Sequence, residues 1–75
     1  MKYYHAKWKN PTELYHRWDG VPHLLIHNKE YIVSVEKDGV WPYLVTVYTL
    51  KGKQITKIPY NCNPNEFWEI LSTMD

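Results

Sequence analysis

The fold of this chain is decided by a run of alternating residues, Glu30-Tyr31-Ile32-Val33-Ser34-Val35-Glu36. Apolar side chains recur at every second position, and most are β-branched or aromatic, which is typical of a strand with one buried face. Residues 23–27 show the same period, and Asn28-Lys29 between the two runs has the length of a two-residue hairpin loop. This hairpin predicts a buried sheet face formed by Leu24, Ile26, Tyr31, Val33 and Val35.

Two further strands are predicted downstream. Lys37-Asp38-Gly39 indicates a turn, after which the alternation continues and adds Trp41, Tyr43, Val45 and Val47 to the same face. Pro42 favours an edge position or a bulge near the start of that strand. Leu50-Lys51-Gly52 indicates a third turn before a last strand over residues 53–60. Its register depends on the loop length, and we expect the one that places Ile55 beside Val47 and Ile58 beside Leu44.

Two segments carry nearly identical signals for the start of a helix, Asn10-Pro11-Thr12-Glu13 and Asn63-Pro64-Asn65-Glu66. In each, Asn can cap the first turn, Pro suits the first helical position, and Glu can reach back to the cap. We predict helices over residues 11–19, ended by Gly20, and over residues 64–74. The second helix would present Phe67, Ile70, Leu71 and Met74 to the sheet at helical spacing.

The predicted fold class is therefore α+β: a four-stranded antiparallel meander flanked by an N-terminal and a C-terminal helix. Residues 1–9 form either a fifth strand or an ordered arm. Seventy-five residues are enough for one small core, so we expect residues 1–75 to form a single domain. Cys62 is the only cysteine, which favours a reducing compartment and a cytoplasmic location.

The sequence lacks the residue spacings typical of metal or catalytic sites. His23 and His27 would lie about 13 Å apart on a strand, too far to share one ion. Cys62 precedes a predicted helix, where a thiol pKa can fall, but no orienting histidine and acid accompany it in a recognisable motif. The three glycines fit turns or a helix end. We predict no metal site, no cofactor and no catalysis.

Aromatic residues are unusually abundant for so small a core, with four Trp and seven Tyr. Rigid aromatic side chains are favoured anchors at protein interfaces. The predicted function is a non-enzymatic protein-binding module: an inhibitor, adaptor or accessory factor, such as a phage or mobile-element protein that blocks a host factor. The candidate partner-binding residues are Tyr3, Tyr4, Trp8, Trp18, Trp41 and Tyr48.

Single-stranded DNA or RNA is the alternative partner. The net charge of +1 excludes a strongly cationic DNA-coating protein, but lysines alternate with aromatic residues near the N-terminus and gather again in the last hairpin. The candidate nucleic-acid-binding residues are Lys2, Lys7, Lys9, Lys51, Lys53 and Lys57. Two further hypotheses are capture of a small ligand in an aromatic pocket and formation of a homodimer through a sheet face or an edge strand.

Overall fold

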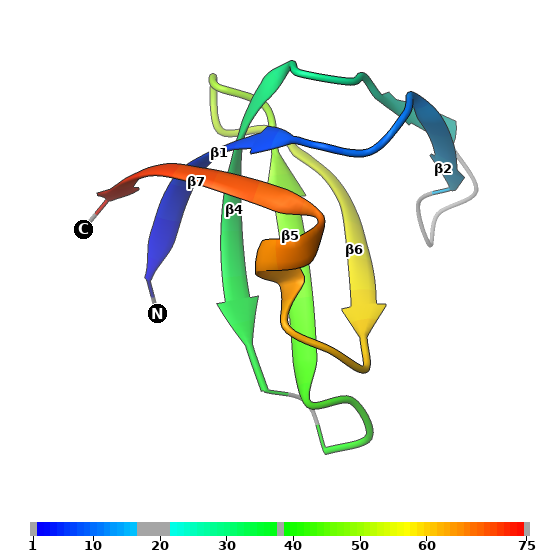
Figure 1. Cartoon of the computed structure of the whole chain (residues 1–75), viewed down its shortest axis with the longest axis vertical. Coiled ribbons are helices and arrows are strands. Elements are labelled where there is room, and N and C mark those ends of the chain that lie inside the picture. The colour runs from blue at the N-terminus through cyan, green and yellow to red at the C-terminus, as the bar shows by residue number, and fades with distance from the viewer. Residues whose placement is uncertain (1, 17–21, 38, 75) are drawn as a thin grey trace.

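The structure, a computed structural model, describes residues 2–16, 22–37 and 39–74. Its elements are β1 (Tyr3–Trp8), β2 (Glu13–His16), β3 (Pro22–Leu25), β4 (Glu30–Glu36), β5 (Tyr43–Tyr48), β6 (Gln54–Tyr60), the 3₁₀ turn η1 (Pro64–Glu66) and β7 (Trp68–Met74). Five strands form an antiparallel sheet in the order β6-β5-β4-β1-β7, and β2 pairs with β3 in a separate ribbon (Figure 1). The predicted α+β class is wrong, because strands occupy described parts of both predicted helices.

The central hairpin of β4 and β5 agrees with the alternation in the sequence. Val33 lies opposite Val47, and Val35 lies opposite Val45, so these four side chains share one face. The N-terminal segment is a strand: β1 pairs with β4 on the side away from β5, which places Tyr4 opposite Val33. The predicted β4–β5 hairpin is confirmed, and of the two alternatives left open for residues 1–9, a strand or an ordered arm, the structure has the strand. Period-two alternation needs only a buried face to decide which side chains point inward.

The first predicted helix is replaced by a strand. Residues 13–16 form β2 and pair with β3, with Leu14 opposite Leu24. Residues 17–19 of that predicted helix, including Trp18, lie outside the described residues. Since β3 pairs with β2, the predicted hairpin between residues 23–27 and β4 is also wrong. A turn does occur there: the Lys29 amide donates to the Ile26 carbonyl at 3.0 Å, and Asn28 adopts a φ of 64°.

This change of pairing exchanges the two faces of residues 24–26. Leu25 is fully buried in the core, whereas Leu24 and Ile26 are 52% and 39% exposed. The alternation in the sequence had indicated the opposite assignment. Successive side chains of a strand point to opposite sides, so an error in choosing the partner strand can move the whole apolar set to the wrong face.

The second predicted helix shrinks to a single turn. Its cap is as predicted: Asn63 Oδ1 accepts from the Asn65 amide at 2.9 Å, and Pro64 takes the first position. The Phe67 amide then donates to the Pro64 carbonyl, and the chain continues as β7 along β1, with Trp68 opposite Trp8. A helix over residues 64–74 would leave the backbone of β1 unpaired on that side, whereas β7 satisfies it and buries Trp68.

The register of the last hairpin also differs from the prediction. Thr56 lies opposite Val47 and Ile58 opposite Val45, while Ile55 has no partner in the register and forms an irregularity between Val47 and Tyr48. An extra residue of this kind shifts the alternation by one position. Ile55 and Ile58, three residues apart, are consequently both buried on the core side.

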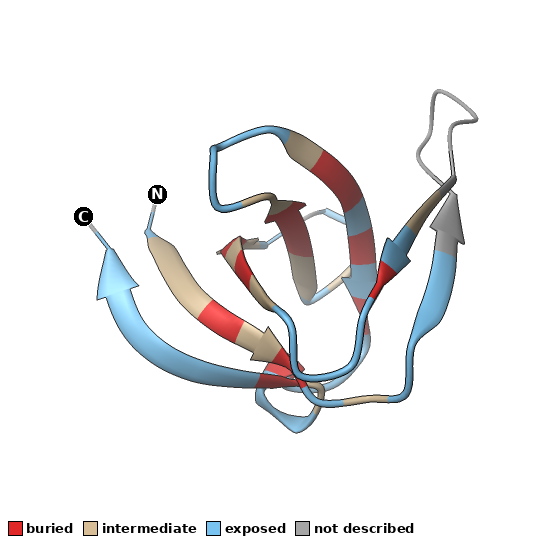
Figure 2. Cartoon of the chain, turned by 90° about the horizontal axis from the view of Figure 1, so that it is seen from above, coloured by how far each residue is buried: buried red, intermediate tan, exposed pale blue. Residues whose placement is uncertain are grey.

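The core lies on the concave side of the curved sheet, where the buried residues face one another (Figure 2). At its centre is an aromatic cluster: the rings of Trp8 and Trp68 are 4.9 Å apart, and Tyr31 meets Trp68 edge-on at 6.0 Å. Trp68 Nε1 donates to the Tyr60 hydroxyl at 3.2 Å, and the Tyr60 ring stacks on Phe67. Geometries of this kind add to the stabilisation from burial alone.

Candidate functional site

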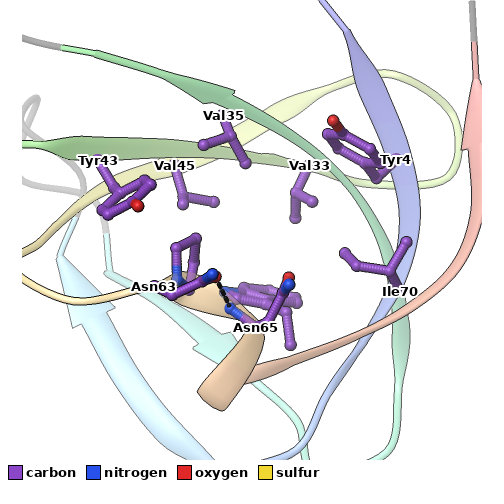
Figure 3. Close-up of a pocket in the computed structure, with 10 residues that line it drawn as sticks. Tyr4, Val33, Val35, Tyr43, Val45, Asn63, Asn65 and Ile70 are labelled. Carbon is purple, nitrogen blue, oxygen red and sulfur yellow. Dashed lines mark hydrogen bonds between the residues drawn. The ribbon is translucent and has the colours of Figure 1, made fainter.

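A pocket of about 380 Å³ opens on the concave side of the sheet, between the β4–β5 hairpin and η1. Its walls come from β1, the β4–β5 hairpin, and η1 with its cap and β7, three parts of the chain that are separate in the sequence (Figure 3). We call it the tyrosine pocket, and its lining consists of Tyr4, Val33, Val35, Tyr43, Val45, Asn63, Pro64, Asn65, Trp68 and Ile70.

The pocket exists because the predicted C-terminal helix is absent. A helix over residues 64–74 was expected to cover the valine face of β4 and β5. Instead η1 ends after Glu66, and β7 turns away along β1. Pro64 is the buried residue of η1, and Val35 and Tyr43 remain half-buried. A sheet face of this kind needs a cover, and here the cover is incomplete.

The tyrosine pocket has an apolar floor and an uncharged polar rim. Val33, Val45 and Trp68 form buried parts of the floor. The rim carries the rings of Tyr4 and Tyr43 and the carboxamides of Asn63 and Asn65, which approach from the η1 side (Figure 3). Asn63 is held by its capping hydrogen bond to the Asn65 amide. A concave apolar surface with a few convergent polar groups is the usual form of a binding site.

The wall behind the pocket is stiffened by the hydrogen bond between Trp68 and Tyr60. Burial raises the pKa of Tyr60 to about 12, above the ordinary value of 10. The phenol is therefore neutral across the physiological range and can accept from the indole. Trp68 is fixed on both sides, by this bond and by its ring contact with Trp8. Such a wall is preformed, which lowers the entropic cost of binding.

The structure distributes the candidate partner-binding residues over separate places. Tyr4 lines the tyrosine pocket. Tyr3 and Tyr48 pair edge-on at 5.8 Å on the convex face, beside Ile32. Trp8 is 0% exposed, so a partner cannot contact it in this conformation.

Trp41 is another candidate partner-binding residue. It is half-buried in the connection before β5 and is not among the residues that line the tyrosine pocket. Trp18 lies outside the described residues. Sequence reasoning missed Asn63 and Asn65 as rim residues, because their spacing around a proline was interpreted as a helix cap alone. It also missed Tyr43, which the alternation had assigned to the covered core.

The candidate lysines lie on different elements of the fold. Lys7 stands between Glu30 and Glu69, its register partners in β4 and β7, and cross-strand neighbours of opposite sign offset its charge. Lys51 and Lys53 are exposed in the β5–β6 turn. The others, Lys2, Lys9 and Lys57, are exposed at the ends of β1 and within β6.

Outside the pocket, the described residues include an exposed thiol and a histidine–carboxylate pair. Among the described residues, no group of three or more His, Cys, Asp or Glu side chains is placed to hold a metal ion. Cys62 is exposed, and local desolvation together with the Glu66 carboxylate raises the pKa of its thiol. A raised pKa lowers the thiolate fraction and hence the nucleophilicity at neutral pH. His5 Nε2 lies 2.7 Å from the Glu30 carboxylate, which makes a surface pair.

Comparisons with protein-family models, with curated proteins and with solved structures find no match for this chain. Within the described residues, no helix has the length and apolar character required to span a membrane.

Proposed function

We propose that this chain is a non-enzymatic protein-binding module that holds an apolar or aromatic side chain of its partner in the tyrosine pocket. One observation carries the proposal: an open, uncharged pocket floored by Trp68 and two valines, with tyrosine and asparagine side chains at its rim. A partner side chain would remove the exposed apolar floor from water, at about 25 cal/mol per Å². The rim hydroxyls and carboxamides would orient the partner's backbone through hydrogen bonds.

The residues that line the pocket favour an uncharged side chain of a protein partner. Among the described residues, none that lines the pocket is charged, so the lining offers nothing to neutralise a phosphate or a carboxylate. Tyrosine is enriched at interfaces because it combines a large rigid ring with a polar tip. These features are sufficient for an inhibitor or adaptor that binds one apolar side chain of its partner.

Two adjacent residues of β7 provide a matched test. Ile70 and Leu71 have almost the same exposure, 39% and 41%, but Ile70 lines the tyrosine pocket and Leu71 is not in its lining. Peptides would be selected from a random phage-displayed library on the wild-type protein and then measured by fluorescence anisotropy. We expect Ile70→Lys to weaken binding by about tenfold or more, because a charge then replaces an apolar contact.

The control is Leu71→Lys, which should leave the affinity within about twofold of wild type. Circular dichroism and thermal melting of both variants would verify that each is folded. Equal loss of affinity in the two variants would contradict the proposal, because it would show that the tyrosine pocket is not the contact surface. Binding that survives in Ile70→Lys would contradict it as well.

Single-stranded nucleic acid remains the second candidate, and one observation favours it. The Tyr3–Tyr48 ring pair borders a hollow of about 310 Å³ that is also lined by Gly52, the residue between Lys51 and Lys53. Rings next to lysines suit stacked bases and backbone phosphates. Titration of a labelled oligonucleotide at about 50 and about 200 mM salt tests this function, since such affinity falls steeply with salt. Absence of binding at the lower salt concentration would contradict a nucleic-acid-binding function.

A further inference from the structure

A second concavity lies at the opposite end of the β4–β5 hairpin from the tyrosine pocket. It has a volume of about 480 Å³ and lies between the turn before β4 and the turn that joins β5 to β6. Residues at the end of β4 and the start of β5 line the tyrosine pocket. Residues at the start of β4 and just after the end of β5 line this second concavity. We call it the lysine groove, and it is lined by His23, Leu24, Lys29, Glu30, Tyr31, Thr49, Leu50, Lys51, Lys53 and Ile55.

The lysine groove concentrates positive charge. Among the described lining residues, Lys29, Lys51 and Lys53 are exposed lysines, and Glu30 is the one carboxylate. That carboxylate is already engaged, because it lies 2.7 Å from His5 Nε2. In a chain whose formal net charge is +1, this groove is a local excess of positive charge. Charge of one sign in a concave site attracts partners of the opposite sign.

The groove also offers aliphatic contact surface. Leu24 and Leu50 are 52% and 58% exposed at its walls, and both are close enough to line the same space. Ile55 is buried beneath them. Leucines left this exposed can gain stabilisation by being covered, and a cluster of them usually marks an interaction surface. The site therefore combines apolar walls with a positively charged border.

This combination selects a peptide over a nucleic acid. Bases bind without sequence preference by stacking on open aromatic faces. Among the described lining residues, the Tyr31 ring is only 2% exposed and the other ring, that of His23, is half-buried. The Tyr31 hydroxyl is occupied by the amide of Ile26 at 3.0 Å. Aliphatic walls instead match leucine-like or phenylalanine-like side chains. We propose that the lysine groove binds an acidic peptide segment that carries apolar anchor residues.

The probe is a fluorescein-labelled synthetic peptide of alternating glutamate and leucine, titrated against the full chain. Three comparison probes separate the contributions of charge, apolar side chains and ligand class. They are the peptide with glutamine in place of glutamate, the peptide with serine in place of leucine, and a single-stranded oligonucleotide. We expect the glutamate–leucine peptide to bind most tightly of the four, with an affinity that decreases with added salt. If this peptide shows no binding up to about 1 mM, the proposal is overturned.

Charge reversal in the exposed turn tests the location. The double variant Lys51→Glu/Lys53→Glu should weaken binding by about tenfold, because two attractive contacts become repulsive. The matched control is Lys2→Glu/Lys37→Glu, which changes the net charge by the same amount: both lysines are exposed and lie outside the groove lining. An equal loss in the control would overturn the proposal, since it would reveal attraction by total charge alone.

The apolar walls are tested by Leu50→Ser, which we expect to weaken the glutamate–leucine peptide and to leave the glutamate–serine peptide unchanged. Tighter binding of the oligonucleotide than of the acidic peptide would overturn the proposal in favour of nucleic acid. Equal binding of the glutamine–leucine peptide would overturn it by removing the role of charge. Ile70→Lys, which alters the tyrosine pocket, should bind the acidic peptide like wild type, so failure at one site is distinguishable from failure at the other.

Discussion

Replacing Tyr60 with phenylalanine removes the hydroxyl that accepts the hydrogen bond of Trp68 Nε1 at 3.2 Å. Both residues are buried, so the indole N–H of the variant is left without this partner in a place that water does not readily reach. Leaving a buried donor unsatisfied costs about 1 to 2 kcal/mol. At neutral pH we therefore expect the free energy of unfolding of Tyr60→Phe to be lower than that of wild type by about this amount.

The difference in the free energy of unfolding between wild type and Tyr60→Phe should change sign at high pH. Burial raises the pKa of Tyr60 from 10 to about 12 in the folded state. A raised pKa of a phenol means that folding favours the neutral form, so this stabilisation is complete below pH 10 and is lost as the pH rises toward 12. A shift of this size corresponds to roughly 2 to 3 kcal/mol, of which about 1.4 kcal/mol is lost by about pH 11. All other titratable groups are common to the two proteins, so the difference in stability between them reports on Tyr60.

Urea denaturation followed by tryptophan fluorescence, from about pH 7 to about pH 11, measures the difference directly. The wild type should be the more stable protein at neutral pH, and the two curves should meet near about pH 11. Absorbance titration of the tyrosinate band provides a second readout, in which one phenol of the wild type ionises last. A stability difference that stays constant over this range would refute the reasoning, because it would show that Tyr60 is as accessible to solvent as an ordinary phenol.

Three further substitutions test details of the fold, each by urea denaturation beside wild type. Thr46→Val should raise the free energy of unfolding by about 1 kcal/mol, because the buried Thr46 hydroxyl has no hydrogen-bond partner among the described residues; a lower stability would show that it has one. Gly52→Ala should lower it by about 1 kcal/mol, since Gly52 has a φ of 90° that alanine adopts with strain; an unchanged midpoint would argue against this turn. Asn63→Ala should lower it by about 1 kcal/mol through loss of the cap on the Asn65 amide, and no effect would mean that η1 contributes little to stability.

The parts of the fold that could be predicted are those in which local pattern and tertiary contact agree. The alternation in β4 and β5 needed only the turn between them to define a hairpin, and its face assignment is confirmed by the pairing of Val33 with Val47. The alternation in residues 2–8 likewise indicated a strand, and β1 is one. The alternation could not predict which strands pair in the sheet, because β4 pairs with β1 on one side and with β5 on the other.

The parts that could not be predicted depend on contacts between distant residues. Asn63 and Pro64 correctly indicated the start of a helical turn, yet a cap contains no information about where the turn ends. Its end is fixed by Trp68, which is buried beside Trp8 sixty residues earlier in the chain. The spacing of Ile70, Leu71 and Met74 resembled a helical stripe, but these side chains are exposed on a strand.

The same long-range contacts decide how much of the candidate site was predictable. Tyr4 was identified because an aromatic surplus was visible in the composition, and it does line the tyrosine pocket. The pocket itself was not predictable, since it is formed where the expected helix is missing. Trp8 was named for the same reason as Tyr4, but it faces the centre of the core, where its ring meets Trp68. Composition gives the number of aromatic residues and says nothing of which ones are covered.

The two outer strands of the sheet explain why concave surfaces are the better candidates for recognition. Within the described residues, β6 and β7 each pair on one side. The sequence of β6 includes Lys57 and Pro59, and proline cannot donate a backbone hydrogen bond to an added strand. In β7, Leu71 has no partner in the register with β1, and such an irregularity bends and twists an edge. Both edges thus carry features that discourage the addition of a strand, so a partner gains more by placing side chains in the tyrosine pocket or the lysine groove than by extending the sheet.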